Sequence, residues 1–401
     1  MSARNRGGPL AGIRVLAIAK VWAGPYAAKL LAQLGAEVIK VESMTALDEM
    51  RAYGGVDIEH APYFLSQNTE ALSVRVNLKS ADGIAQLRRM IAVSDVVLDN
   101  LRPGALDKLG LSFAQMQAIR PDVIHVSIKM YGCEGPLGYQ TGYAPSFAAI
   151  GGLTGLVGHE GAVPRGMNIR YGDTTAGAAA ALGAIAALHH REATGKGQQV
   201  DLSAVEAISG LVGDSLFACG LTGELPRHAG NAHAELAPHG FYPASECGWI
   251  AIACDGDAQW QALARTLGGD LSADPRFATH AARLANRSEL DTAIARASAA
   301  HDAATLAETL RAAGLCAARA NSTLDLMAED RFWSDGTYRM VTCGNGDMRP
   351  VIGPSWRIEP DEAELTRGAP LLGEHDDYVY RELLGMDEAE FERLRENGAI
   401  G

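Results

Sequence analysis

Apolar and helical segments alternate from the start of the chain. Residues 13–18 (IRVLAI) predict a strand, and residues 26–34 (YAAKLLAQL) follow with leucines at helical spacing. Gly35 is suited to end that helix, and a second apolar run lies at 37–42 (EVIKVE). Strand, helix, glycine and strand form a βαβ unit, which predicts two parallel strands joined by a right-handed crossover.

The same alternation continues through the first half of the chain. Strands are predicted at 72–76, 96–98 and 123–128, and helices at 80–93 and, briefly, after Pro103 and Phe113. Such alternation predicts a doubly wound parallel sheet of Rossmann type, with ligands at the carboxyl ends of its strands. A helix over 174–192 is nearly all small and apolar and is expected to be buried, with a strand after it at 199–203.

The pattern changes in the second half. A stretch rich in His, Gly and Pro at 220–240 resembles a linker, residues 241–254 predict a hairpin, and residues 257–315 are mostly helical. The chain ends on a predicted helix at 388–396. We predict an α/β large domain over 1–220, a linker and smaller α+β domain over 221–325, and a return segment over 326–401 that completes the large domain.

Composition and charge narrow the class of protein. The chain has 401 residues and a formal net charge of −13, which argues against a general partner for nucleic acid or a membrane surface. Six scattered cysteines form no C-x-x-C pair and predict no metal site or disulfide framework. The N-terminus lacks the apolar core of a signal peptide, and the small-apolar run at 176–188 is too short to span a bilayer. A cytoplasmic protein is expected.

Asp173, in the segment RYGDTTAG, is the most informative acid. It sits at the predicted start of the 174–192 helix, where an aspartate commonly caps free backbone N–H groups. The alternative role is a carboxylate nucleophile, since Gly172 and the small residues that follow leave room for a substrate. Both roles remain open from the residues alone.

Basic residues follow several predicted strands. Lys40, Arg102, Lys108 and Lys129 are either solvated surface charges or ligands for phosphates. Arg102 belongs to the segment DNLRPG directly after the 96–98 strand, where a doubly wound sheet binds ligands. Trp22 and Tyr143 are equally consistent with an apolar pocket and with core packing. The loop VWAGP after the first strand lacks the glycines of a dinucleotide site, which disfavours a nicotinamide enzyme.

Ordered blocks across nearly the whole chain resemble the class III coenzyme A transferases. They are the opening LAGIRVLAIAKVWAGPYAAKLLAQLGAEVIKVE, DNLRPGALDKLGLSF, RPDVIHVSIKMYGCEGP, YGDTTAG, REATGKGQQVDLSAVEA and the ending LGEHDDYVYRELLG. The resemblance implies a Rossmann-like large domain, a small domain and two interlocked protomers, with coenzyme A (CoA) as substrate and no permanently bound cofactor or metal. A hetero-oligomer with a homologous subunit is a further possibility.

The resemblance also implies roles for single residues. Asp173 falls on the family's catalytic aspartate, and Tyr143 on a tyrosine near the active site. Ala23 and Gly24 are similar to the loop beside the catalytic carboxylate. Positions that contact CoA are matched by Asn100, Leu101, Lys108 and Lys129, with Arg102 among them in the same segment.

The chain departs from the formyl-CoA transferase pattern at three places. Trp22 stands where that enzyme has an active-site glutamine, Ser43 where it has an arginine, and residues 254–257 replace its glycine loop. These departures argue against oxalate and formate, and Trp22 predicts a larger, more apolar acid.

The predicted reaction moves CoA from an acyl-CoA, for which succinyl-CoA is the expected donor, to a free carboxylic acid. The expected acceptor is an aromatic or branched acid such as a substituted succinate, for example benzylsuccinate. Asp173 would form an aspartyl-CoA thioester, with backbone N–H groups of the VWAGP loop and of the 174–192 helix stabilising the oxyanion. Two alternatives remain. An α-methylacyl-CoA racemase needs a histidine where this chain has Tyr143, and a non-catalytic CoA-binding subunit would show no exchange.

Overall fold

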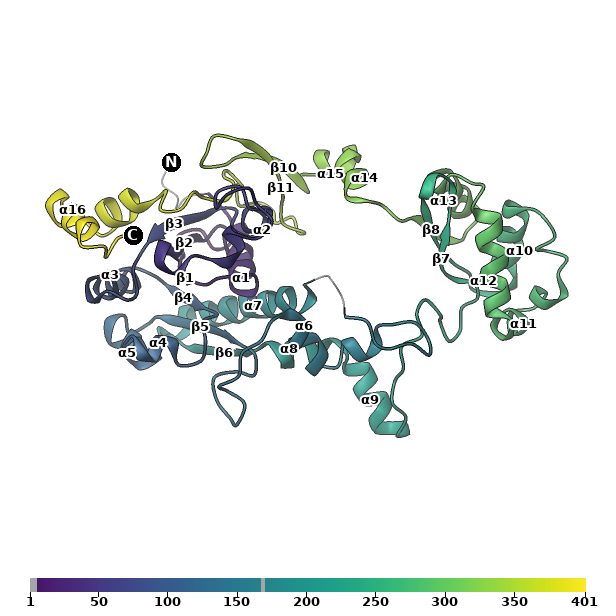
Figure 1. Cartoon of the computed structure of the whole chain (residues 1–401), viewed down its shortest axis with the longest axis horizontal. Coiled ribbons are helices and arrows are strands. Elements are labelled where there is room, and N and C mark those ends of the chain that lie inside the picture. The colour runs from purple at the N-terminus through teal and green to yellow at the C-terminus, as the bar shows by residue number, and fades with distance from the viewer. Residues whose placement is uncertain (1–5, 167–169) are drawn as a thin grey trace. The chain divides into compact units, whose positions relative to one another are not determined.

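The computed structural model describes residues 6–166 and 170–401, and it divides into two compact units (Figure 1). The larger unit comprises Met1–Thr154, Gly166–Glu224 and Arg331–Gly401, and the smaller unit comprises Gly155–Arg165 and Leu225–Asp330. We expected residues 155–165 in the large domain. They belong to the smaller unit instead, where the Gly230 N–H donates to the Gly158 carbonyl at 2.7 Å.

The larger unit is built on a six-stranded parallel sheet in the order β3-β2-β1-β4-β5-β6. This is the doubly wound order expected of a Rossmann-like fold, and it places the topological switch point between β1 and β4. Five of the strands are almost entirely buried, as their apolar runs predict. The strands are β1 (Arg14–Ile18), β2 (Glu37–Glu42), β3 (Ala71–Arg75), β4 (Val96–Asp99), β5 (Ile124–Lys129) and β6 (Gln199–Ser203).

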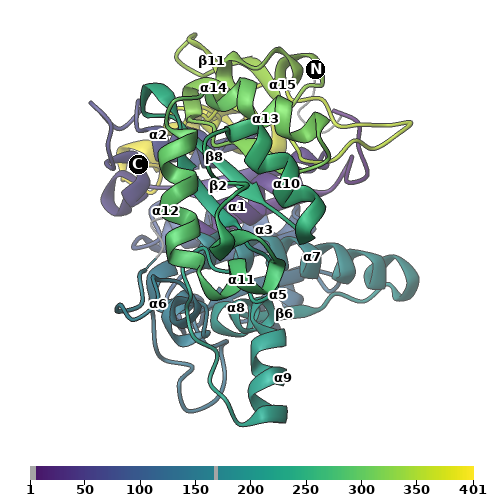
Figure 2. The same cartoon turned by 90° about the vertical axis from the view of Figure 1, so that its right-hand side faces the viewer.

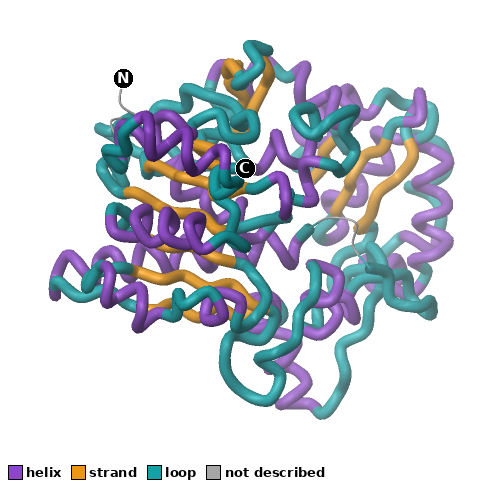
Figure 3. The backbone as a smooth tube through the Cα atoms, turned by 60° about the vertical axis from the view of Figure 1, so that its left-hand side comes forward, coloured by secondary structure: helices purple, strands orange, loops and turns teal. Residues whose placement is uncertain are grey.

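Alternate residues of the strands face two separate cores, one on each side of the sheet. Val15 and Ala17 of β1 belong to the core with helices α1, α7 and α8, whereas Leu16 and Ile18 belong to the core with α3, α5 and α16. Figure 3 shows the strands side by side with helices against them. The helices are α1 (Ala23–Gln33), α2 (Pro62–Gln67), α3 (Ala81–Ala92), α4 (Ala105–Lys108), α5 (Phe113–Ile119), α6 (Ala144–Ile150), α7 (Tyr171–Thr194), α8 (Ala204–Leu211), α9 (Gly213–Thr222) and α16 (Glu388–Glu396).

The C-terminal segment returns to the larger unit. Val379, Tyr380 and Phe391 are buried in the core beside α3, and the predicted closing helix is α16 with the bounds expected. Two elements were not predicted from the sequence: a hairpin of β10 (Tyr338–Thr342) and β11 (Met348–Ile352), and a π-helical turn, η6 (Tyr378–Leu383). A salt bridge from Arg6 to buried Glu70, which also accepts the Arg367 N–H at 2.8 Å, joins both chain ends to the sheet.

The smaller unit, of which several helices and β8 are labelled in Figure 2, has its own core. The predicted hairpin is confirmed as β7 (His239–Pro243) and β8 (Trp249–Ala253), and a third antiparallel strand, β9 (Cys316–Arg319), was not anticipated. Buried Trp260 and Phe277 pack edge to face at 5.9 Å between ring centroids. Its main helices are α10 (Gly256–Leu267), α11 (His280–Ala285), α12 (Arg287–Ser298), α13 (Ala303–Ala312) and α14 (Thr323–Ala328), and α15 (Asp330–Ser334) follows at the boundary with the larger unit.

Helices α1 and α7 pack against each other at backbone distance. A Cβ atom added at Gly177 would lie 2.6 Å from the Ala23 carbonyl oxygen and 3.0 Å from the Tyr26 ring. The facing residues of α7, Ala176, Ala180 and Ala184, are likewise small and fully buried. The small-apolar composition of α7 therefore permits this approach, which places the start of α7 beside the start of α1.

We expect Gly177→Ala to lower the free energy of unfolding by about 2 kcal/mol or more, because the added methyl group overlaps a backbone oxygen that cannot rotate away. Gly210→Ala is the matched control, since Gly210 is helical in α8 and has open space around it. The Gly210→Ala substitution should raise the free energy of unfolding by up to about 1 kcal/mol. Urea unfolding measures both, and equal effects at the two positions would contradict the close approach.

Candidate active site

The loop after β1 meets the end of β4 at the switch point. The Asn100 side-chain amide accepts from the Lys20 N–H at 2.9 Å and donates to the Lys20 carbonyl at 2.8 Å. A Cβ atom at Gly24 would lie 2.6 Å from the Ala19 Cβ and 3.0 Å from Asn100 Cγ. Asn100, predicted to contact CoA, thus also fixes the loop, and Ala23 and Gly24 are buried in packing within the first turn of α1.

Val21 in this loop is held in a left-handed backbone conformation, with φ of 67°. That conformation is rare for a β-branched residue and indicates local strain. Buried Asp48 holds Val21 in this conformation by accepting the Val21 N–H at 3.0 Å. Lys40 donates to both the Ala19 carbonyl and Asp48 at 2.8 Å. Burial raises the pKa of Asp48, but Lys40 and the backbone donors outweigh it and leave the pKa below its ordinary value.

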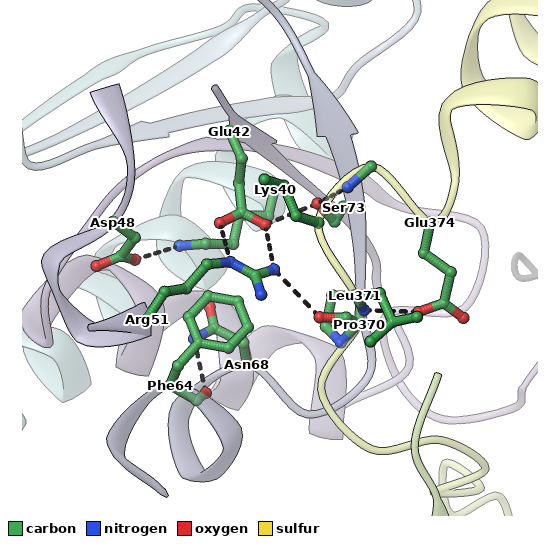
Figure 4. Close-up of polar contacts among 12 residues, drawn as sticks. Lys40, Glu42, Asp48, Arg51, Phe64, Asn68, Ser73, Pro370, Leu371 and Glu374 are labelled. Atoms are coloured by element: carbon green, nitrogen blue, oxygen red, sulfur yellow. Dashed lines mark hydrogen bonds and ion pairs between the residues drawn. The ribbon is translucent and has the colours of Figure 1, made fainter. Parts of the chain in front are cut away.

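A second buried ion pair, Arg51 with Glu42, lies near the Lys40–Asp48 pair (Figure 4). Arg51 binds Glu42 through two contacts of 2.9 and 2.8 Å, and its guanidinium lies 3.7 Å from the Phe64 ring centroid. Arg51 also donates to the carbonyl of Pro370 in the C-terminal return at 3.1 Å. Lys40, expected as a phosphate ligand or a surface charge, is neither exposed nor unpaired, because Asp48 neutralises it inside this network.

Asp173 lies in the first turn of α7, which begins at Tyr171, three residues earlier than predicted. The N-cap position is Arg170, no side chain caps the helix, and within the described ranges the Asp173 carboxylate has no hydrogen bond. The capping role considered for Asp173 is therefore wrong. Its neighbour Gly172 packs on the Ala144 carbonyl oxygen, which a Cβ atom would approach to 2.7 Å.

Burial controls the acidity of Asp173, which is 8% exposed. Desolvation raises the pKa of this carboxyl to about 6, against a smaller lowering by the positive charge of Arg170. The group remains mostly ionised at neutral pH, yet it is far less stabilised than a solvated aspartate. A desolvated, unpaired carboxylate is a stronger nucleophile than one held by hydrogen bonds.

Arg170 and two aromatic rings form a cluster beside this carboxylate, which we call the Arg170 clamp: Arg170, Trp22 and Tyr63. The guanidinium carbon lies 4.7 Å from the centroids of both rings, which meet edge to face at 5.5 Å. Trp22 was a candidate from the sequence, whereas Arg170 and Tyr63 were not. The only sequence signal for Arg170 was its place three residues before Asp173.

The predicted CoA-binding residues lie after β4 and at the end of β5. Arg102 and Lys108 are exposed, and neither forms an ion pair within residues 6–166 and 170–401. Lys129 is buried and bonded to Asp99 at 2.5 Å, which also contacts His125 at 2.9 Å and accepts the Leu101 N–H at 3.0 Å. Arg102 and Lys108 thus offer free positive charge, whereas Lys129 is already neutralised.

Two further predicted features have definite places. Tyr143 is the N-cap of α6 and is exposed, one residue before Ala144, which touches Gly172. The VWAGP loop was expected to supply oxyanion donors, but the Val21 N–H is taken by Asp48. Any oxyanion donors from this loop must therefore come from the residues after Val21.

The described residues contain no cluster of side chains suited to a metal ion. Within the same ranges no single helix is long and apolar enough to cross a bilayer, although α8 and α9, bent by 67°, meet the criteria of length and composition together. The larger unit thus has the doubly wound α/β fold, and its site contains a buried carboxylate that has no hydrogen bond within the described residues.

Comparison with known proteins identifies the family. The model of CoA-transferase family III matches residues 10–376. Succinyl-CoA–D-citramalate CoA-transferase of Chloroflexus aurantiacus is 31% identical over 407 residues, covering 100% of both chains. The alpha subunit of succinyl-CoA–L-malate CoA-transferase of the same species is 30% identical, over 98% of this chain and 92% of that one. A CAIB/BAIF family protein from Brucella suis matches with a TM-score of 0.88 and 31% identity, over 94% and 100% of the two chains.

The chain belongs to CoA-transferase family III and is an enzyme of that class. Its substrates are acyl-CoA thioesters and carboxylic acids, and the predicted family resemblance is confirmed.

We expect Asp173→Asn to stabilise the fold at neutral pH. Because the folded-state pKa lies above that of the unfolded chain, ionisation of Asp173 costs stability as pH rises from about 4 to about 6. The variant should therefore unfold with a free energy about 1–3 kcal/mol higher at pH 7 and nearly equal at pH 4. Urea unfolding across this range is the measurement, and a pH-independent difference would contradict the burial of a charged carboxylate.

Proposed function

We propose that this enzyme transfers CoA from succinyl-CoA to a substituted succinate through a covalent intermediate on Asp173. The observation that carries the proposal is the desolvated carboxylate in the first turn of α7, without a hydrogen bond inside the described ranges. The succinyl donor is supported by the names of two relatives, which use succinyl-CoA. Their acceptors, D-citramalate and L-malate, are both hydroxylated succinates.

The reaction exchanges one CoA thioester for another, and overall no proton is taken up or released. The Asp173 carboxylate attacks the thioester carbonyl, which forms a mixed anhydride and expels the CoA thiolate. The thiolate attacks the Asp173 carboxyl carbon, which gives an aspartyl-CoA thioester and releases succinate. The acceptor carboxylate then attacks this thioester, which forms a second mixed anhydride and expels the CoA thiolate. The thiolate attacks the acceptor's acyl carbon in this anhydride, which gives the acceptor's CoA thioester and releases the Asp173 carboxylate.

Each step needs protection from water, because anhydride and thioester both hydrolyse. The low exposure of Asp173 and the close contact of Gly172 with Ala144 support such protection. Arg102 and Lys108 supply free cations for the phosphates of CoA, and binding energy from that distant nucleotide positions the thioester. Lys129 would contribute through its placement of Asp99 and the Leu101 backbone.

The aromatic acceptor predicted from Trp22, such as benzylsuccinate, has less support than an acceptor with a polar substituent. The Trp22 ring contacts the Arg170 guanidinium and Tyr63. Because the Arg170 guanidinium covers the Trp22 ring, the site has a positive charge at this position. The racemase alternative has no support from the geometry, because Asp173 has no histidine partner in the described ranges.

The Asp173 intermediate is tested by trapping. Incubation with succinyl-CoA followed by hydroxylamine should convert Asp173 to a hydroxamate that mass spectrometry detects, and omission of succinyl-CoA is the control. Asp173→Asn should lose transferase activity by at least about 1,000-fold, because no carboxylate remains to attack. An unmodified Asp173 in an active enzyme, or full activity of the variant, would rule out the mechanism.

We also propose that two chains form an interlocked homodimer. Helix α9 has no buried residue and lies beyond α8, away from the sheet (Figure 1). Its apolar side chains are exposed, with Phe217 at 77% and Leu221 at 86%. Such a surface is typical of an interface. A relative named as an alpha subunit makes a pair with a homologous chain the alternative.

Light scattering should give twice the chain mass of 42.3 kDa for the purified protein. Phe217→Asp with Leu221→Asp should reduce the dimeric fraction, because the charges would be buried at the interface. A monomer that is fully active would contradict this proposal.

A further inference from the structure

Arg170 is a charged residue whose hydrogen-bonding capacity is unused. Its guanidinium contacts the Trp22 and Tyr63 rings at 4.7 Å, yet it has no ion pair and no side-chain hydrogen bond in the described part of the chain. A guanidinium has five N–H donors in a planar fork. Arg170 is partly buried, and the buried arginines described in this unit, Arg6, Arg14 and Arg51, each pair with a carboxylate.

A second donor without an acceptor belongs to the same cluster. The Trp22 indole nitrogen is buried and has no hydrogen-bond partner. Indole N–H groups usually find an acceptor when buried. Two independent donors on residues in direct contact therefore indicate a missing acceptor, and the positive charge of Arg170 indicates that this acceptor is an anion.

The place of the clamp indicates which anion. Arg170 is the N-cap of α7, Asp173 lies in the first turn, and the two charges interact. The phosphates of CoA are separated from the thioester by the whole pantetheine arm. A cation beside Asp173 therefore meets the acyl group or the acceptor acid, and a carboxylate matches the fork of a guanidinium in two parallel hydrogen bonds.

We propose that Arg170 is a specificity-determining residue that binds the non-reacting carboxylate of a dicarboxylic substrate. Trp22 and Tyr63 hold the guanidinium in place, and one carboxylate of the acid reacts at Asp173 while the other pairs with Arg170. This inference rests on the proposed function and deepens it. It predicts selection of diacids without requiring Arg170 to take part in bond making.

Matched acids test this role. Succinate and butyrate have the same chain length and differ only in the second carboxylate. Each acid, isotopically labelled, is offered with unlabelled succinyl-CoA, and label in the thioester gives kcat/KM. The wild type should prefer succinate, and Arg170→Gln should lose about 100-fold for succinate but less than about threefold for butyrate. Arg170→Lys, which keeps the charge and loses the fork, should lose about tenfold for succinate.

The control variant is Lys196→Gln, which removes a positive charge beyond the opposite end of α7 and should leave both rates unchanged. Loss of Arg170 also raises the pKa of Asp173, but this affects both acids equally and cancels in their ratio. Equal losses for succinate and butyrate in Arg170→Gln, or no loss, would overturn the inference while leaving CoA transfer intact. Absence of any exchange in the wild type would overturn the proposed function and this inference with it.

Discussion

The approach of helices α1 and α7 is the constraint on which the candidate site depends. Gly177 meets the Ala23 carbonyl at a distance that no side chain would permit, and buried alanines continue the contact along α7. The two helices cover the same face of the sheet, and their starts carry Trp22 and the Arg170–Asp173 segment, respectively. A wider separation would part Trp22 from Arg170 and would open Asp173 to water.

The buried ion pairs around the switch point hold the loop after β1 in place more than they stabilise the fold. Lys40, Asp48, Glu42 and Arg51 lie inside the protein and satisfy one another, and pairs of this kind contribute little net stability once desolvation is counted. Asp48 accepts the N–H of strained Val21, and Arg51 reaches Pro370 in the C-terminal return. The network therefore links the loop that carries Trp22 to a distant part of the chain, so the strained loop is held in one conformation.

The candidate site contains unpaired positive charges, although the whole chain is negatively charged. The chain carries a net charge of −13, yet the cations without a carboxylate partner in the described ranges include Arg102, Lys108 and Arg170. Asp173 is an acid whose pKa is raised by burial, and the positive charge of Arg170 lowers that pKa by a smaller amount. A few unpaired cations suffice for anionic substrates, because the local potential depends on nearby charges.

The sequence motif singled out Asp173 as a candidate nucleophile. The alternation of strands and helices, the parallel sheet and the closing helix α16 could also be predicted from the sequence. These follow from local periodicity, which burial on one or two faces imposes on every strand and helix. Four facts required the folded structure: α7 begins at Tyr171, Lys129 is neutralised by Asp99, residues 155–165 belong to the smaller unit, and Arg170 contacts Trp22 and Tyr63. Those facts depend on residues far apart in the chain, and no local pattern records which distant side chain will neutralise a charge or leave it free for a substrate.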